Sequence, residues 1–114
     1  MNNGWIGVDL DGTLAYHGDW QGPTHVGEPI PLMLARVKKW LSEGIEVRIV
    51  TARVASTSQG REEARNAIKI WCKEHIGVEL EVTSEKDYGM IELWDDRSVS
   101  IEFNTGKLRR IVEE

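Results

Sequence analysis

The 114-residue sequence has a single cysteine, Cys72, so it cannot form a disulfide within the chain. This scarcity is typical of proteins kept in a reducing compartment. The sequence also lacks an apolar run near the roughly 20 residues that a membrane-spanning helix requires. Its first residues are polar and then strand-like, which does not match a signal peptide. We therefore expect a cytoplasmic protein with no membrane contact.

Positive charge is scarce as well. Lysine and arginine number 14 against 19 aspartates and glutamates, which gives a formal net charge of −5 and a pI of about 5.2. No general basic field is therefore available to bind nucleic acid. The length is close to the commonest domain size, and no repeat, linker or low-complexity tract divides the chain. We expect one domain over residues 1–114.

The most informative stretch covers residues 5–14, Trp-Ile-Gly-Val-Asp-Leu-Asp-Gly-Thr-Leu. Its apolar start is typical of a strand that is buried on both faces. Carboxylates at the carboxyl end of such a strand lie where open α/β sheets usually bind ligands. Asp9 and Asp11 would share a face of an extended chain, and two like charges that close require a cation or a shared proton. The stretch predicts a metal site, a perturbed acid, or both.

Two other interpretations of this stretch are a calcium-binding loop and an acidic surface turn. A calcium hand needs an acidic or amide ligand at loop position five and a glycine at position six. Counted from Asp9, these positions hold Thr13 and Leu14, so the calcium loop is excluded. A surface turn would not follow a strand of the buried type.

Hydrophobic periodicity predicts alternating strands and helices along the rest of the chain. We expect a helix that begins at Pro31 and ends before Gly44, and a second helix over about 61–75. Strands are expected over 45–50, 78–83, 91–94 and 99–103. This order predicts an α/β fold with a mostly parallel sheet of about five strands. The connection between the last two strands is too short for a parallel crossover, so the last strand is either a short edge piece or antiparallel.

Residues 15–30 form a long irregular region with several glycines and prolines. Long loops in small domains are often lids or binding loops. Tyr16, His17, Trp20 and His25 give this loop aromatic and titratable side chains. Two interpretations stay open: the loop covers a site, or Trp20 simply pins it to the body of the protein.

The segment Asp9-Leu-Asp11-Gly12-Thr13-Leu14 after an apolar strand resembles the first motif of the haloacid dehalogenase (HAD) superfamily of phosphotransferases. Three further motifs follow in the order of that superfamily: a strand ending at Thr51, then Lys86, then Asp95-Asp96 after a strand. The resemblance implies a HAD-like Rossmannoid three-layer sandwich. Residues 27–31, 51–53 and 94–97 look like those of small capless phage and bacterial members, and the gaps between motifs leave no room for a folded cap domain.

The resemblance also implies residue roles. Asp9 would be the nucleophile, and Asp11 would protonate the leaving oxygen and then activate water. Thr51 and Lys86 would hold the phosphate. Mg²⁺ would be bound by Asp9, the Asp11 backbone carbonyl and Asp95, with Asp96 as a further acid or an outer-shell group.

Charge balance adds one expectation. The four carboxylates carry more charge than Mg²⁺ and Lys86 neutralise, so we expect a proton on Asp11, or Arg53 or Arg97 turned inward. For Arg97 an ordinary ion pair is favoured. Arg53 follows Thr51 by two residues and is the better candidate for a substrate contact.

The sequence thus predicts a Mg²⁺-dependent phosphatase that hydrolyses a phosphomonoester through an aspartyl-phosphate. The substrate would be a phosphorylated small molecule, or a nucleotide or nucleic-acid end stacked on Tyr16 or Trp20. A non-catalytic module that binds Mg²⁺ and phosphate is the alternative of a different class. The loop or a second subunit of a homo-oligomer would shield the site, or the site stays open.

Overall fold

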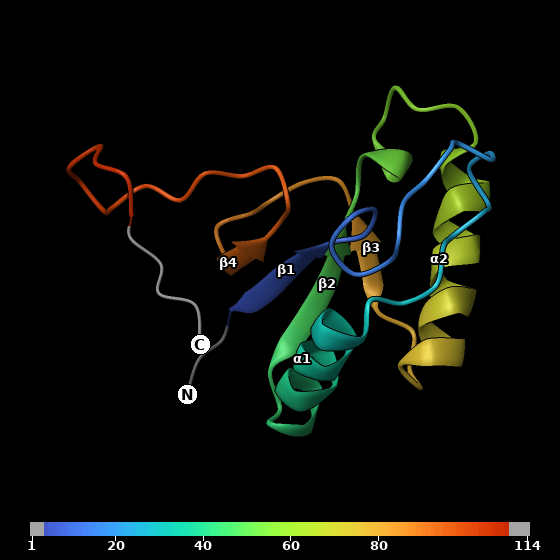
Figure 1. The fold of residues 1–114 in the computed structure, drawn as a ribbon, viewed down its shortest axis with the longest axis horizontal. Coiled ribbons are helices and arrows are strands. Elements are labelled where there is room, and N and C mark those ends of the chain that lie inside the picture. The colour runs from blue at the N-terminus through green and yellow to red at the C-terminus, as the bar shows by residue number, and fades with distance from the viewer. Residues whose placement is uncertain (1–3, 110–114) are drawn as a thin grey trace.

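In the computed structural model, which describes residues 4–109, strands and helices alternate along the chain (Figure 1). The elements are β1 (Trp5–Asp9), α1 (Pro31–Ser42), β2 (Glu46–Val50), the 3₁₀ turn η1 (Ala52–Val54), α2 (Arg61–His75), β3 (Glu81–Thr83) and β4 (Met90–Trp94). The helix expected over 61–75 is confirmed at both ends. The first helix begins at Pro31 as expected, because proline suits the first turn, where its missing N–H costs nothing.

The strands pair in the order β3-β2-β1-β4, and every pairing is parallel. The central strand β1 lies between β2 and β4, with Val8 opposite Ile49 on one side and Trp94 on the other. The carboxyl ends of these three strands therefore meet at one edge of the sheet. The side chains that follow them are brought together there.

One face of the sheet carries the hydrophobic core. Strand residues that alternate in sequence, such as Ile6 and Val8, share this face because side chains on a strand point to opposite sides in turn. The same core cluster contains the buried residues of both helices, so α1 and α2 cover the same face (Figure 1). The cluster consists of Ile6, Val8, Leu10, Leu14, Ala15, Met33, Val37, Val47, Ile49, Val54, Ala64, Ile68, Trp71, Cys72, Leu80 and Val82.

The opposite face is covered by side chains and a loop instead of a helix. Arg48 stacks on the buried Trp5 ring, with its guanidinium carbon 4.4 Å from the ring centroid. Asp87, in the connection between β3 and β4, accepts a 2.8 Å hydrogen bond from Trp5 Nε1 and one of 3.3 Å from Arg48 Nη1. The α/β prediction is confirmed, but within residues 4–109 the expected second helical layer is not formed.

The expected fifth strand over 99–103 was wrong, and the described chain forms a sheet of four strands. Ile101 makes only an isolated antiparallel bridge to Leu108. Between them the chain turns at Asn104 and Gly106, both of which have positive φ. Apolar residues alternate here, but no neighbouring element of the described chain buries them, and Phe103 is 81% exposed. The segment therefore folds back on itself and does not extend the sheet.

No helix in the described part of the chain is both long and apolar enough to cross a membrane.

Candidate functional site

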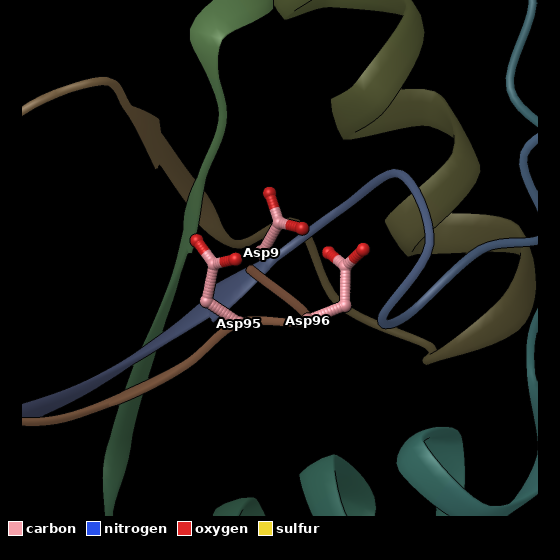
Figure 2. A group of neighbouring side chains, drawn as sticks. All are labelled: Asp9, Asp95 and Asp96. Atoms are coloured by element: carbon pink, nitrogen blue, oxygen red, sulfur yellow. The ribbon is translucent and has the colours of Figure 1, made fainter. Parts of the chain in front are cut away.

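Three carboxylates meet at the edge where β1 and β4 end. Asp9 is the last residue of β1, and Asp95 and Asp96 directly follow β4. One oxygen of each carboxylate lies within 4.8 Å of those of the other two. Figure 2 shows the three carboxyl groups extending to the same side of the chain. The structure thus brings together three of the four acids that the sequence assigned to a metal site.

The environment of Asp9 favours its protonated form. Burial raises the pKa of Asp9 from the ordinary 3.8 to about 7, and a hydrogen bond shared with Asp96 and the charge of Asp95 add to the rise. The same hydrogen bond lowers the pKa of Asp96. Without a cation, a proton on this pair is therefore favoured on Asp9 over Asp96. From the sequence, a proton on Asp11 was one of the expected ways to balance the charge.

Thr13 connects the two halves of this cluster. Its hydroxyl oxygen lies 3.2 Å from Asp9 Oδ2 and 3.2 Å from Asp96 Oδ1, and it accepts a 3.0 Å hydrogen bond from the Asp96 backbone N–H. The hydroxyl has one proton and can donate to only one carboxylate at a time. No role for Thr13 was predicted from the sequence, although its place in the first motif was a signal for one.

The Asp11 side chain lines the same cavity but is not part of the group of three acids, and it pairs with Arg53. Arg53 donates from Nε to Asp11 Oδ2 and from Nη2 to Asp11 Oδ1, both at 2.9 Å. This two-point geometry is the strongest form of an arginine–carboxylate pair. His17 Nδ1 lies 3.6 Å from Asp11 Oδ1 on the exposed side. These contacts occupy the Asp11 side chain, whereas the resemblance implied that its backbone carbonyl binds the metal.

Arg53 also holds the loop over 15–30. Its Nη1 donates to the carbonyl oxygens of Pro23 at 3.0 Å and His25 at 2.6 Å, and its side chain is only 7% exposed. The guanidinium carbon lies 4.9 Å from the centroid of the Trp20 ring. The inward turn expected of Arg53 is present, and its side chain donates hydrogen bonds to Asp11 and to the loop. A contact between Arg53 and a substrate would use the N–H groups that these hydrogen bonds leave free.

The base of the loop is fixed independently of Arg53. The Trp71 indole N–H donates to the Gly27 carbonyl at 2.9 Å, which ties the loop to α2. Gly27 has no room for a side chain, because a Cβ there would collide with the Tyr16 carbonyl oxygen. The loop is therefore anchored at both sides of its base, and Trp20 from its outer part lines the same cavity as the acidic cluster.

A cavity of about 1030 Å³ opens in front of these groups. Thr51, which is 4% exposed, lies on its wall directly after β2, and its hydroxyl oxygen accepts a 3.2 Å hydrogen bond from the Arg53 backbone N–H. The wall carries both acids and arginines. Its charged and aromatic members are Asp9, Asp11, His17, Trp20, Arg53, Arg61, Glu62, Arg65, Glu85, Asp95, Asp96 and Arg97.

Lys86 is the one predicted site residue that the structure does not bring to this cavity. It lies in the exposed connection between β3 and β4. Ser84 and Glu85 of this connection line the cavity wall, and Lys86 does not. The connection is drawn to the opposite face of the sheet by Asp87, which bonds to Trp5 and Arg48. Lys86 thus belongs to a segment that is held by Trp5 and Arg48 and not by the acidic cluster.

Two arginines from the first turns of α2 line the cavity in its place. Arg61 donates to the Ser56 carbonyl at 3.0 Å, and Arg65 donates to the Val82 carbonyl and lies 3.6 Å from Glu62. From the sequence, this helix was predicted only as an amphipathic core element. The signal that could have indicated the two arginines is their spacing of four residues at the start of the helix that follows the Thr51 strand.

The residues present fit a hard divalent cation. Oxygen ligands from carboxylates suit Mg²⁺, which usually takes one or two of them and keeps several waters. Burial is the main cause of the raised pKa of Asp9, and the neighbouring Asp95 and Asp96 add to it. Exposed acidic groups occur without metals, so the burial and raised pKa of Asp9 are the features that distinguish this cluster.

No family model matches the sequence, and no curated protein matches it. Among solved structures, the chain resembles a conserved protein from Bacteroides thetaiotaomicron with a TM-score of 0.58 and 24% sequence identity. The match covers 86% of this chain and 79% of that one. At this level of identity the likeness supports the α/β fold alone.

Proposed function

We propose that this protein is a Mg²⁺-dependent phosphomonoesterase that works in the manner of the HAD superfamily. The observation that carries the proposal is the meeting of Asp9 with Asp95 and Asp96 at the carboxyl edge of a parallel sheet, with Thr51 on the wall of the same cavity. A phosphate in that cavity would meet a nucleophile, a hydroxyl donor and a cation site together. Fold, motif order and site geometry all favour the same chemistry.

In the first half of the proposed reaction, a carboxylate oxygen of Asp9 attacks the phosphorus of the ester. A bond forms between Asp9 and phosphorus, and the bond from phosphorus to the leaving oxygen breaks. Asp11 donates a proton to that oxygen, and the alcohol departs. Thr51 donates its hydroxyl hydrogen to a non-bridging oxygen and holds the phosphoryl group in line with Asp9.

In the second half, water attacks the phosphorus of the aspartyl-phosphate. Asp11 accepts a proton from this water, the bond between Asp9 and phosphorus breaks, and inorganic phosphate leaves. Asp9, Asp95 and the Asp11 carbonyl would hold Mg²⁺. Asp96, which contacts the Thr13 hydroxyl, would orient these ligands from outside. The cation supplies charge neutralisation for a phosphate placed beside an anionic nucleophile.

The pairing of Asp11 with Arg53 affects how Asp11 can transfer a proton. Arg53 donates to both carboxylate oxygens of Asp11 at 2.9 Å, so a proton transfer at either oxygen must loosen one of these two hydrogen bonds. A leaving group that needs little protonation avoids this step in the first half of the reaction. We therefore expect aryl phosphates to react faster than alkyl phosphates.

The test is phosphate release from p-nitrophenyl phosphate by the full chain, with Mg²⁺ and with EDTA. We expect release that requires Mg²⁺ and falls by about a thousandfold or more in Asp9→Asn, because the nucleophile is lost. Asp19→Asn is the matched control, since Asp19 is an exposed acid of the 15–30 loop. Release that persists in Asp9→Asn would rule out the covalent mechanism.

A non-catalytic module that binds Mg²⁺ and phosphate is the second candidate. It is favoured by one observation: Lys86, the cation expected beside the phosphate, lies outside the described cavity wall. Saturable, Mg²⁺-dependent binding of phosphate without turnover of any ester would support this candidate. Turnover would exclude it.

A further inference from the structure

We propose that Trp20 is a stacking surface for the base of a nucleoside monophosphate, so that a mononucleotide is the substrate class. This inference rests on the proposed phosphomonoesterase activity and names its substrate. It is carried by the position of Trp20 on the wall of the same cavity as Asp9, Asp95 and Asp96.

The cavity is larger than a phosphate group needs. Its volume of about 1030 Å³ is at the upper end of the roughly 300–1,000 Å³ that small-molecule pockets occupy. A phosphoryl group held at the acidic cluster would fill only one end. The remaining space can hold the rest of a larger substrate, and Trp20 is the aromatic side chain that lines it.

Arg53 fixes the Trp20 ring from one side. The guanidinium is 4.9 Å from the ring centroid and is itself held by Asp11 and by two loop carbonyls, so it is a rigid support. Trp20 is nevertheless 61% exposed, so much of its surface remains accessible to a ligand. A large exposed aromatic ring that is already oriented can accept a planar partner at little entropic cost.

An aromatic face selects for a base because every base has a π-face, and such stacking tolerates all of them. Tyr16, the other aromatic residue near the start of the loop, is 59% exposed but lies outside the cavity wall. The net charge of −5 favours a single nucleotide over a polynucleotide, because a long phosphate backbone would meet an acidic protein. The position of Trp20 thus distinguishes it from the rest of the loop.

The experiment compares adenosine 5′-monophosphate with D-ribose 5-phosphate, which has the same phosphoester and lacks the base. We expect kcat/KM to be roughly tenfold or more higher for the nucleotide, which is the range that stacking on one aromatic ring supplies. In Trp20→Ala the ratio of the two values should fall toward one, and Trp20→Phe should keep most of it. Tyr16→Ala is the control and should leave the ratio as it is.

Two outcomes would overturn the inference: equal kcat/KM for both esters in the unaltered protein, or an equal loss for both in Trp20→Ala, which would show that Trp20 only supports the loop. A 3′-phosphorylated or 5′-phosphorylated oligonucleotide preferred over the mononucleotide would also contradict it.

If no ester is turned over, the proposed activity fails separately, and binding decides the inference. Calorimetry with Mg²⁺ should then show tighter binding of the nucleotide than of ribose 5-phosphate, and this difference should disappear in Trp20→Ala. Equal binding of the two ligands would overturn the stacking surface.

Discussion

At the scale of single residues, Asp9 has the environment least like that of a carboxylate in water. Its pKa rises to about 7 because it is buried beside Asp95 and Asp96. In the unfolded chain it would titrate near its ordinary value of 3.8. Between these two values the folded protein holds a proton that the unfolded chain has lost. Folding is therefore progressively disfavoured as the pH rises through this window.

This predicts a pH dependence for the metal-free protein. In EDTA, the contribution of Asp9 to stability should fall from about pH 4 to about pH 7 and stay low above that. Asp9→Asn removes the titrating group, so the variant should gain thermal stability relative to the unaltered protein at pH 8 and not at pH 4. Melting temperatures at both values, with Asp19→Asn as control, check this. A constant difference between the two proteins would contradict it.

Arg53 provides the second prediction at this scale. Its loss leaves Asp11 partly buried without its cation and releases two loop carbonyls. Breaking a buried ion pair costs about 3–5 kcal/mol, and the partial exposure of Asp11 reduces this, so we expect Arg53→Ala to destabilise the protein by about 2 kcal/mol. Urea unfolding measures the change, with the exposed Lys38→Ala as control. Equal stability of the two variants would show that the pair is only a surface contact.

The acidic cluster was predictable from the sequence because each of its residues lies at the end of an apolar strand or just after it. Asp9, Asp95 and Asp96 follow apolar strands, and parallel strands bring such residues to one edge. The pairing of Asp11 with Arg53 joins residues 42 positions apart, and no spacing rule indicates it. The position of Lys86 was equally beyond reach, because it depends on the bonds that Asp87 makes across the sheet.

At the scale of elements, the inner face of α2 is what connects the helix to the site-bearing strands. Ile68 is fully buried in the core cluster, whereas Ile70, on the same helix, is 68% exposed. The two residues have the same side chain and the same local helix context, so they form a matched pair.

We expect Ile68→Ala to lower the free energy of unfolding by about 2–5 kcal/mol, because it leaves a cavity in the core. Ile70→Ala should change it by less than about 0.5 kcal/mol, as is usual for exposed sites. Urea titration of both variants gives the two values. Similar losses in both would mean that α2 does not pack as described.

Periodicity predicted α2 over 61–75 from a stripe made of Ala64, Ile68, Trp71 and His75. The structure buries the first three of these residues. Periodicity failed for 99–103, where the alternation of apolar residues is real but no neighbouring strand accepts it. A local pattern indicates which side chains could be buried on one face. Whether a neighbouring strand or helix is present to bury them depends on the whole sheet and cannot be deduced from a short stretch of sequence.

At the scale of the whole molecule, the acidic cluster exists only when β1 and β4 are paired. A cation that binds there binds the folded chain and not the unfolded one. Mg²⁺ should therefore raise the melting temperature, by the equivalent of about 2.7 kcal/mol when its concentration is a hundred times the Kd. Asp95→Asn should lose most of this response, and Asp19→Asn should keep it. Calorimetric scans with and without Mg²⁺ make the comparison, and an equal response in both variants would contradict the site.

The most direct test of the central claim is a crystal structure of the full chain with Mg²⁺ and beryllium fluoride, which mimics a phosphoryl group on a carboxylate. The account predicts beryllium bonded to an oxygen of Asp9, with Mg²⁺ held beside it by Asp9 and Asp95, and with the Thr51 hydroxyl donating to fluorine. Beryllium fluoride bound elsewhere, or Mg²⁺ coordinated without Asp9, would contradict it.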